Sequence, residues 1–144
     1  MAITTAICTS FKVDLYNARH NFAVAGNQMR IALYVTATLG AATTAYTATN
    51  EVVGTGYVAK GNALTNIAPT STGTTAFIDF ADTTWSTSTI TADGCMIYND
   101  TITTPVADAS VQVHDFGGAK TSTAADFTIA FPTADSTNAI QRLA

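Results

Sequence analysis

The clearest secondary-structure signal in the sequence is the segment Gln28-Met29-Arg30-Ile31-Ala32-Leu33-Tyr34-Val35-Thr36. Two sets of side chains alternate along it: Met29, Ile31, Leu33 and Val35 on one side, and Gln28, Arg30, Tyr34 and Thr36 on the other. Successive side chains of a β-strand point to opposite faces of its sheet. The alternation therefore predicts a β-strand with one apolar and one more polar face.

Before this strand the spacing of the apolar residues is four instead of two. The residues that share this spacing are Ile3, Ile7, Phe11 and Leu15. Such a stripe is typical of one face of an α-helix, and the hydroxyl of Thr4 or Thr5 can cap the start of that helix. We therefore expect an N-terminal amphipathic helix within residues 1–20, and a break in the pattern over 21–28 with a turn at Gly26.

After the strand the chain enters a long glycine-containing stretch, residues 39–61, which Tyr46 and Tyr57 are expected to fix to the body. Further short strands are predicted at 62–67, 75–80, 87–91, 95–98, 110–116, 126–131 and 139–143. Turn-forming residues separate these runs at 69–73, 92–94, 104–105, 117–118 and 132–137. The apolar run over 95–98 is typical of a strand covered on both faces.

The fold class predicted from this pattern is mainly β. About eight short strands with turn-rich connections indicate a jelly-roll-like antiparallel β-sandwich, with one N-terminal helix. Too few helical segments exist to cross over between parallel strands. A length of 144 residues suits one domain. We therefore expect a single domain over 1–144, with the helix in 1–20 and the sandwich in 28–144.

The composition is low in charge and rich in hydroxyl groups. Charged residues are 11% of the chain, against roughly 25% in an ordinary domain, and the net charge is −4. The six Lys and Arg residues are scattered, whereas phosphate binding needs clustered cations. We expect no nucleic-acid and no membrane partner. The opening residues lack the basic and apolar regions of a secretory signal, so synthesis in a cytoplasm is expected.

The residues that commonly carry chemistry do not form a recognisable motif. His114 and Asp115 are adjacent on a predicted strand and so point to opposite faces, and no nucleophile-elbow pattern is present. Two Cys and two His lack zinc-ligand spacing. Asp79 and Asp82 could both offer oxygens to calcium, but the preferred interpretation is a solvent-facing strand residue and a turn former. We expect no enzyme activity, no cofactor and no metal.

Several apolar residues are candidates for contacts with another protein. Trp85 is either a core or rim aromatic or an interface anchor, since Trp and Tyr are enriched at binding hot spots. The helix stripe either covers its own sheet, which is favoured, or docks on a neighbour. The candidate interface residues are Ile7, Phe11, Leu15, Tyr34, Tyr57 and Trp85.

An ordered set of segments along most of the chain carries a resemblance. These segments are Ala2-Ile3-Thr4-Thr5-Ala6-Ile7-Cys8, Ser10-Phe11-Lys12, Ile31-Ala32-Leu33-Tyr34, Thr43-Thr44-Ala45-Tyr46, Gly54-Thr55-Gly56-Tyr57, Ala76-Phe77-Ile78-Asp79-Phe80-Ala81-Asp82 with Trp85, Ile97-Tyr98-Asn99, Asp126-Phe127-Thr128-Ile129 and Phe131-Pro132. Together the set resembles a family of small tailed-bacteriophage proteins, especially of short-tailed phages. The resemblance implies a capsid cement or decoration protein on the virion surface, with the major capsid protein as partner and a homodimer as assembly. It supplies no catalytic or interface residue.

Three other functions remain open at this level. A receptor- or glycan-binding module of a tail fibre or spike would stack sugars on Trp85, Tyr34 and Tyr57. A head–tail adaptor would form a ring at one vertex. A small hydrolase would need Ser, His and Asp side chains to meet through the tertiary structure.

Overall fold

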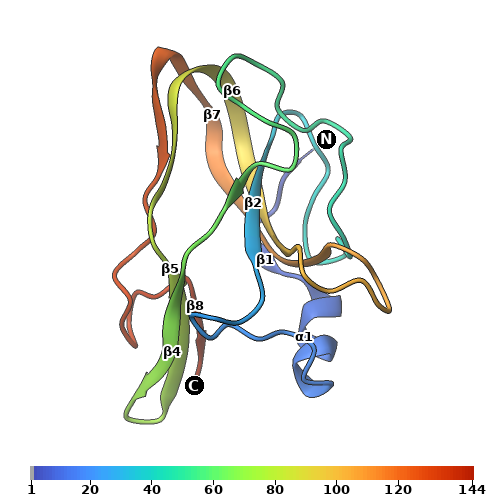
Figure 1. Cartoon of the computed structure of the whole chain (residues 1–144), viewed down its shortest axis with the longest axis vertical. Helices are drawn as coiled ribbons and strands as arrows, with labels where there is room; N and C mark the ends of the chain where they lie inside the picture. Colours follow the sequence, from blue (N-terminus) through green and yellow to red (C-terminus); the bar gives the residue numbers. More distant parts are fainter. Residues whose placement is uncertain (1) are drawn as a thin grey trace.

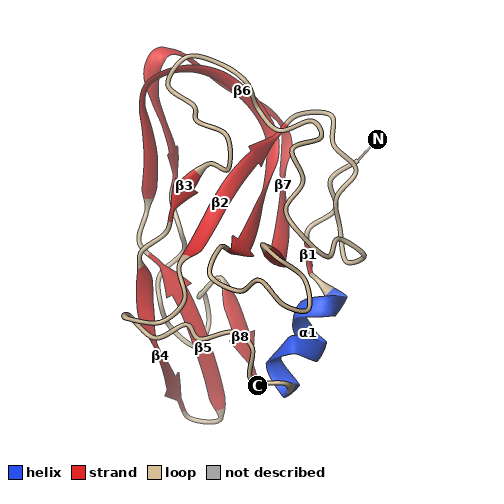
Figure 2. Cartoon of the chain, turned by 45° about the vertical axis from the view of Figure 1, so that its right-hand side comes forward, coloured by secondary structure: helices blue, strands red, loops and turns tan. Residues whose placement is uncertain are grey.

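The computed structural model describes residues 2–144 and shows two antiparallel β-sheets with one short helix (Figures 1 and 2). Strands account for 48% of the residues and helix for 6%. The predicted fold class, a mainly β antiparallel sandwich with one N-terminal helix, is therefore confirmed. No helix within residues 2–144 has the length and apolar character that crossing a membrane requires.

The larger sheet has five strands in the order β1-β7-β6-β2-β3. Their bounds are β1 (Ala6–Ile7), β7 (Ala109–Ile129), β6 (Thr83–Asn99), β2 (Met29–Tyr34) and β3 (Asn62–Ala63). The smaller sheet has the order β4-β5-β8, with bounds β4 (Asn66–Thr72), β5 (Thr75–Phe80) and β8 (Gln141–Leu143). The helix is α1 (Thr9–Tyr16).

A single pair of long strands, β6 and β7, forms two arms of the larger sheet that are joined by a bend. Figure 1 shows the two strands rising side by side and turning over at the top of the molecule. The first arm pairs residues 83–92 with 120–129, and the second arm pairs 94–99 with 109–115. Between the arms the register shifts, so that residues 116–119 of β7 face only residue 93 of β6. An unequal number of residues on paired strands bends the ladder and lets strands turn a corner between layers.

Glycines make this corner possible. A Cβ atom on Gly94 would lie 2.4 Å from the carbonyl oxygen of His114, closer than any real contact. Gly117 and Gly118 have φ angles of +71° and +125°, a region that side chains disfavour. The sequence pattern predicts turns at 92–94 and 117–118 that end separate strands. The structure corrects this prediction, because both sites are bends within continuous strands.

The helix is shorter than the predicted 1–20. It spans eight residues and begins after Cys8, whose extended backbone (φ −64°, ψ 138°) marks the boundary. Ile7 lies in β1 and Ile3 forms a bridge to Leu39, so neither belongs to a helical stripe. The β-branched residues in the segment Ile3-Thr4-Thr5 favour extended backbone, which here outweighs the spacing of four.

Strand β2 is buried on both faces rather than one. Residues 31–34 are fully buried, including Tyr34, which the alternation places on the more polar face. The irregular segment 39–61 accounts for this burial, because it packs along β2. It also forms backbone hydrogen bonds with the edge of β2 that β3 leaves unpaired. The amide of Val52 donates to the carbonyl of Leu33 (2.9 Å), and the amide of Val35 donates to the carbonyl of Asn50 (3.0 Å). The predicted burial of 95–98 on both sides is confirmed.

Candidate functional site

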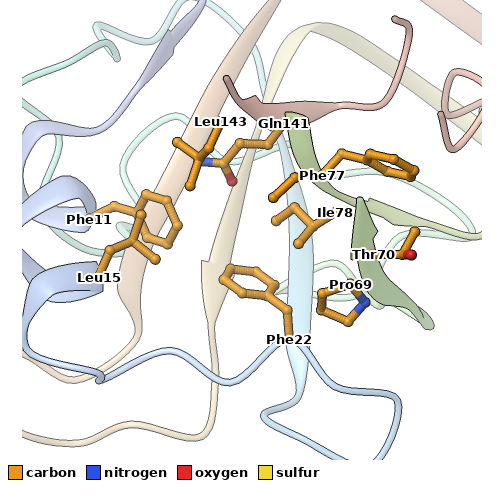
Figure 3. Close-up of a pocket in the computed structure, with 10 residues that line it drawn as sticks. Phe11, Leu15, Phe22, Pro69, Thr70, Phe77, Ile78, Gln141 and Leu143 are labelled. Atoms are coloured by element: carbon orange, nitrogen blue, oxygen red, sulfur yellow. The ribbon is translucent and has the colours of Figure 1, made fainter. Parts of the chain in front are cut away.

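A strongly apolar cavity lies between α1 and the small sheet (Figure 3). Its volume is about 210 Å³. The lining residues carry no ionisable group: Phe11, Leu15, Phe22, Pro69, Thr70, Ala76, Phe77, Ile78, Gln141 and Leu143. Such a pocket binds by excluding water from apolar surface, because it offers almost no polar atom for orientation.

Local structure explains why these side chains meet. Phe11 and Leu15 are four residues apart on α1 and therefore lie on one helix face. Gln141 and Leu143 alternate along β8 and therefore share one face of the small sheet. Their partners on β5, Ile78 and Ala76, lie opposite them in register, which completes the sheet wall of the pocket. In Figure 3 the α1 side chains and those of the small sheet face each other across the cavity.

Aromatic contacts support the helix side of the pocket. The rings of Phe11 and Phe22 meet edge to face with centroids 5.9 Å apart, and Phe22 lies 6.4 Å from Phe80. Leu143, by contrast, is 58% exposed at the rim. The pocket therefore has a packed base and an accessible mouth.

A buried polar cluster lies beneath the helix. The side-chain amide of Asn99 donates to Nδ1 of His20 (3.0 Å), so the neutral ring carries its proton on Nε2, 3.6 Å from Asp14. Asp14 also accepts a hydrogen bond from Arg19. Burial lowers the pKa of His20, although the neighbouring Asp14 carboxylate opposes that shift. The neutral histidine serves as a packed hydrogen-bond acceptor that ties the segment after α1 to β6.

A second buried network fixes the long irregular segment to the sheet. Glu51 accepts hydrogen bonds from the hydroxyls of Tyr46 and Tyr57 and from the amide of Lys60 (2.7 Å). The Tyr57 hydroxyl in turn accepts from the amide of Leu33 (2.9 Å). Burial, followed by the hydrogen bond to Glu51, raises the pKa of Tyr46 to about 12. All these donors are used internally, so this network is structural.

His114 lines a different cavity, of about 180 Å³, between the two arms of the sandwich. The other lining residues are Ile31, Cys95, Ile97, Phe116, Ile129, Ala130, Phe131 and Ile140. No serine and no carboxylate line it, so the groups that a hydrolase mechanism requires do not meet there. Burial lowers the pKa of His114, and its Nε2 atom has no hydrogen-bond partner within residues 2–144.

The described part of the chain contains no cluster of metal ligands, and its two cysteines are buried. Within residues 2–144 no three His, Cys, Asp or Glu side chains lie close enough together to hold a metal ion. Cys8 and Cys95 are both buried and unpaired, and burial raises the pKa of each thiol, that of Cys95 to about 12. Neither thiol is a thiolate at neutral pH.

The predicted orientation of Asp79 is wrong. Its side chain is buried, with 1% exposed, and accepts hydrogen bonds from the amides of Phe80 and Ile140. The segment before β8 covers this face of β5, a tertiary contact that a local pattern does not reveal. Burial raises the pKa of Asp79.

No family model matches this sequence, and no curated protein or solved structure matches it significantly.

The candidate interface residues occupy three different places. Phe11, Tyr34 and Trp85 are buried in the chain's own core, and Ile7 packs against that core from β1. Tyr57 stacks on Trp85 with ring centroids 5.8 Å apart and is partly buried. Phe11 and Leu15 are brought together at the pocket, and Tyr57 and Trp85 are brought together by their stacked rings. An interface role for these six residues remains a prediction.

Sequence reasoning missed the remaining walls of the pocket. Phe22 lies in a segment without periodicity, and no local signal reveals that it packs against Phe11 and Phe80. Leu143 could have been found, because the predicted strand 139–143 places Gln141 and Leu143 on one face. The pairing of β8 with β5 that joins them to Ile78 is a long-range contact and has no signal in the local sequence.

Proposed function

We propose that this chain is a structural virion protein that binds the outside of a tailed-bacteriophage capsid and cements adjacent capsomers without catalysis. The observation that carries the proposal is the chemistry of its accessible surface, which combines hydroxyl-rich strands with one uncharged apolar pocket. The resemblance in the sequence supplies the phage context. The partner proposed is the major capsid protein, and the assembly proposed is a homodimer.

The exposed faces of β6 and β7 illustrate this surface. Two cross-strand hydroxyl pairs, Thr84–Thr128 (2.8 Å) and Thr91–Thr121 (2.9 Å), bridge the first arm. Thr side chains present a methyl and a hydroxyl group together, so such a surface contacts another protein without desolvating charge. A standard interface buries roughly 1,600 Å² in total, and repetition over a symmetric shell adds avidity.

The test is the number of copies in particles of the phage whose genome encodes the chain. Quantitative mass spectrometry of purified virions should find a stoichiometry comparable to that of the capsomers. A handful of copies per particle would contradict cementing. A cryo-EM map then distinguishes the sites, because density on the shell supports the proposal, whereas density only at one vertex indicates an adaptor and density only on a fibre indicates a receptor module.

The glycan-binding alternative draws no support from the aromatic side chains. A sugar-stacking platform needs exposed rings, but Tyr34 and Trp85 are 0% and 3% exposed, and Tyr57 uses its hydroxyl and ring internally. We therefore retain the structural role as the only proposal.

A further inference from the structure

We propose that the pocket receives one large apolar side chain from an extended segment of another protein, and that this segment pairs as a strand with the free edge of β8. The inference deepens the proposed function, on which it rests for the biological partner. It identifies the chemistry of that partner as an extended, largely uncharged strand with an apolar anchor.

The edge of β8 is the first observation. β8 is the last strand of the small sheet and pairs on one side with β5, through Ala76↔Leu143, Phe77↔Arg142 and Ile78↔Gln141. On its other side β8 has no backbone hydrogen-bond partner within residues 2–144. In Figures 1 and 2 β8 lies between β5 and α1, so its free edge faces the helix side of the pocket. Unpaired backbone groups on a sheet edge are a template for an added strand.

The side-chain pattern of β8 connects this edge to the pocket. Gln141 and Leu143 line the pocket, whereas Arg142 projects from the opposite face. Residues on an added strand share the face of the residues directly opposite them. A partner residue opposite Leu143 or Gln141 therefore points toward the pocket, and the residue between them lies beside Arg142.

The size and polarity of the pocket define the anchor. An engineered apolar cavity of about 150 Å³ accommodates benzene, so about 210 Å³ suits one phenylalanine or leucine side chain. The lining carries no charge and only Thr70 and Gln141 as polar side chains, which excludes a charged anchor on desolvation grounds. Burial of a large apolar side chain is the typical energetic centre of a protein interface.

Charge complementarity argues against a second copy of this chain as the occupant. The only symmetric antiparallel register that uses all three residues of both β8 strands places Arg142 opposite its own copy. Like charges directly opposite each other destabilise a strand pair. A different chain with an acidic residue at that position replaces this repulsion with attraction, so the partner strand is best described as apolar–acidic–apolar.

The test uses a synthetic peptide, Thr-Val-Thr-Phe-Asp-Val-Thr with both ends blocked, and the full ¹⁵N-labelled chain. Its Phe, Asp and Val are designed to lie opposite Leu143, Arg142 and Gln141. We expect saturable NMR shifts at the amides of Leu15, Phe22 and Leu143. Replacing Phe by Ala, or N-methylating the backbone amide of the Asp, which would pair with the outward-facing backbone groups of Arg142, should weaken binding at least tenfold. Replacing Asp by Lys should weaken it at least threefold.

A pair of protein variants provides the matched control. Ala76 is exposed on β5 and lines the pocket, so Ala76→Phe should fill the pocket and weaken peptide binding at least tenfold. Ala63 is an exposed alanine on β3 of the other sheet, and Ala63→Phe should bind the peptide like the wild type. Circular dichroism melts confirm that both variants fold. No peptide binding at millimolar concentration, or equal binding by Ala76→Phe, would overturn the inference.

Particle binding separates the inference from the proposed function. The pocket inference and the cementing function predict different outcomes when the variants are added to particles that lack the protein. If the wild type and Ala76→Phe bind particles equally, cementing stands and the pocket inference fails. If the peptide binds the wild type but not Ala76→Phe, and neither protein binds particles, the pocket stands and cementing fails. A wild-type dimer in sedimentation analysis that Ala76→Phe abolishes would show that a second copy is the occupant.

Discussion

Individual residues show how differently the same side chain can be used in this fold. His20 accepts a hydrogen bond from Asn99 and faces Asp14, whereas His114 lines an apolar cavity with Nε2 unpaired among residues 2–144. Burial lowers the pKa of both rings. The unfolded chain therefore takes up protons first on acidification. The contribution of these two histidines to the free energy of unfolding is fully present above about pH 6.5 and is lost as the pH drops through their folded-state pKa values.

His114→Leu should stabilise the protein at neutral pH. The change removes a buried polar atom without a partner and leaves an apolar side chain among Ile31, Ile97 and Phe131. We expect a gain of about 1 kcal/mol in the free energy of unfolding and a shallower loss of stability below pH 6.5. Urea denaturation between pH 5 and 8 measures both effects.

His20→Leu is the comparison variant, because it removes the hydrogen bond that Asn99 donates to Nδ1, although Nε2 of His20, like that of His114, has no hydrogen-bond partner within residues 2–144. It should lower the free energy of unfolding by about 1–3 kcal/mol. Loss of stability in His114→Leu of the same size would mean that His114 has a hydrogen-bonding role in solution.

Residue environments could be predicted only where the local pattern decides them. The opposite faces of His114 and Asp115 follow from strand geometry, and the structure has one partly buried and the other exposed. Tyr34 and Asp79 were not predictable, because the segment 39–61 and the segment before β8 bury them from a distance in sequence.

Elements depend on a few residues that anchor or bend them. Phe11 is 1% exposed on α1 and packs against Phe22, so Phe11→Ala should lower the melting temperature and cost about 3–5 kcal/mol. Tyr16 is 95% exposed on the same helix. Tyr16→Ala is therefore the control, with a change of less than about 0.5 kcal/mol. An unchanged melting temperature in Phe11→Ala would place the ring in an intermolecular contact.

The corner in β6 and β7 gives a graded prediction. Gly94→Ala places a Cβ atom 2.4 Å from the backbone oxygen of His114, and backbone cannot move aside as a flexible side chain can. Gly117→Ala meets no atom within 4 Å and incurs only the strain of a positive φ, about 1 kcal/mol. Thermal melts should therefore rank Gly94→Ala as clearly the less stable variant. Equal melting temperatures would show that the corner relaxes freely.

Strand existence was more predictable than strand continuity. The segment 75–80 agrees with β5 throughout, and each predicted run from 87 to 131 overlaps β6 or β7. The glycines at 94, 117 and 118 predict turns from the local sequence, because glycine is favoured both where a chain reverses and where a strand bends. Only pairing between β6 and β7, over up to 46 positions from Thr83 to Ile129, distinguishes the two.

The whole molecule has a formal charge of −4 and an uncharged pocket, which sets the expected response to salt. Charge-driven association weakens steeply as salt screens it, whereas apolar and neutral polar contacts do not. For the proposed capsid role, retention on phage particles should therefore change by less than about threefold between 50 and 500 mM NaCl. Co-sedimentation measures this. Release at high salt would indicate a charge-based contact instead.

The bend in the β6–β7 pair has a mechanical consequence for the proposed role of bridging neighbouring capsomers. Both arms of the bent pair are formed by the same two backbones, so a pull on either arm is transmitted along β6 and β7 to the other. The two arms cannot separate unless the backbone hydrogen bonds next to the bend break.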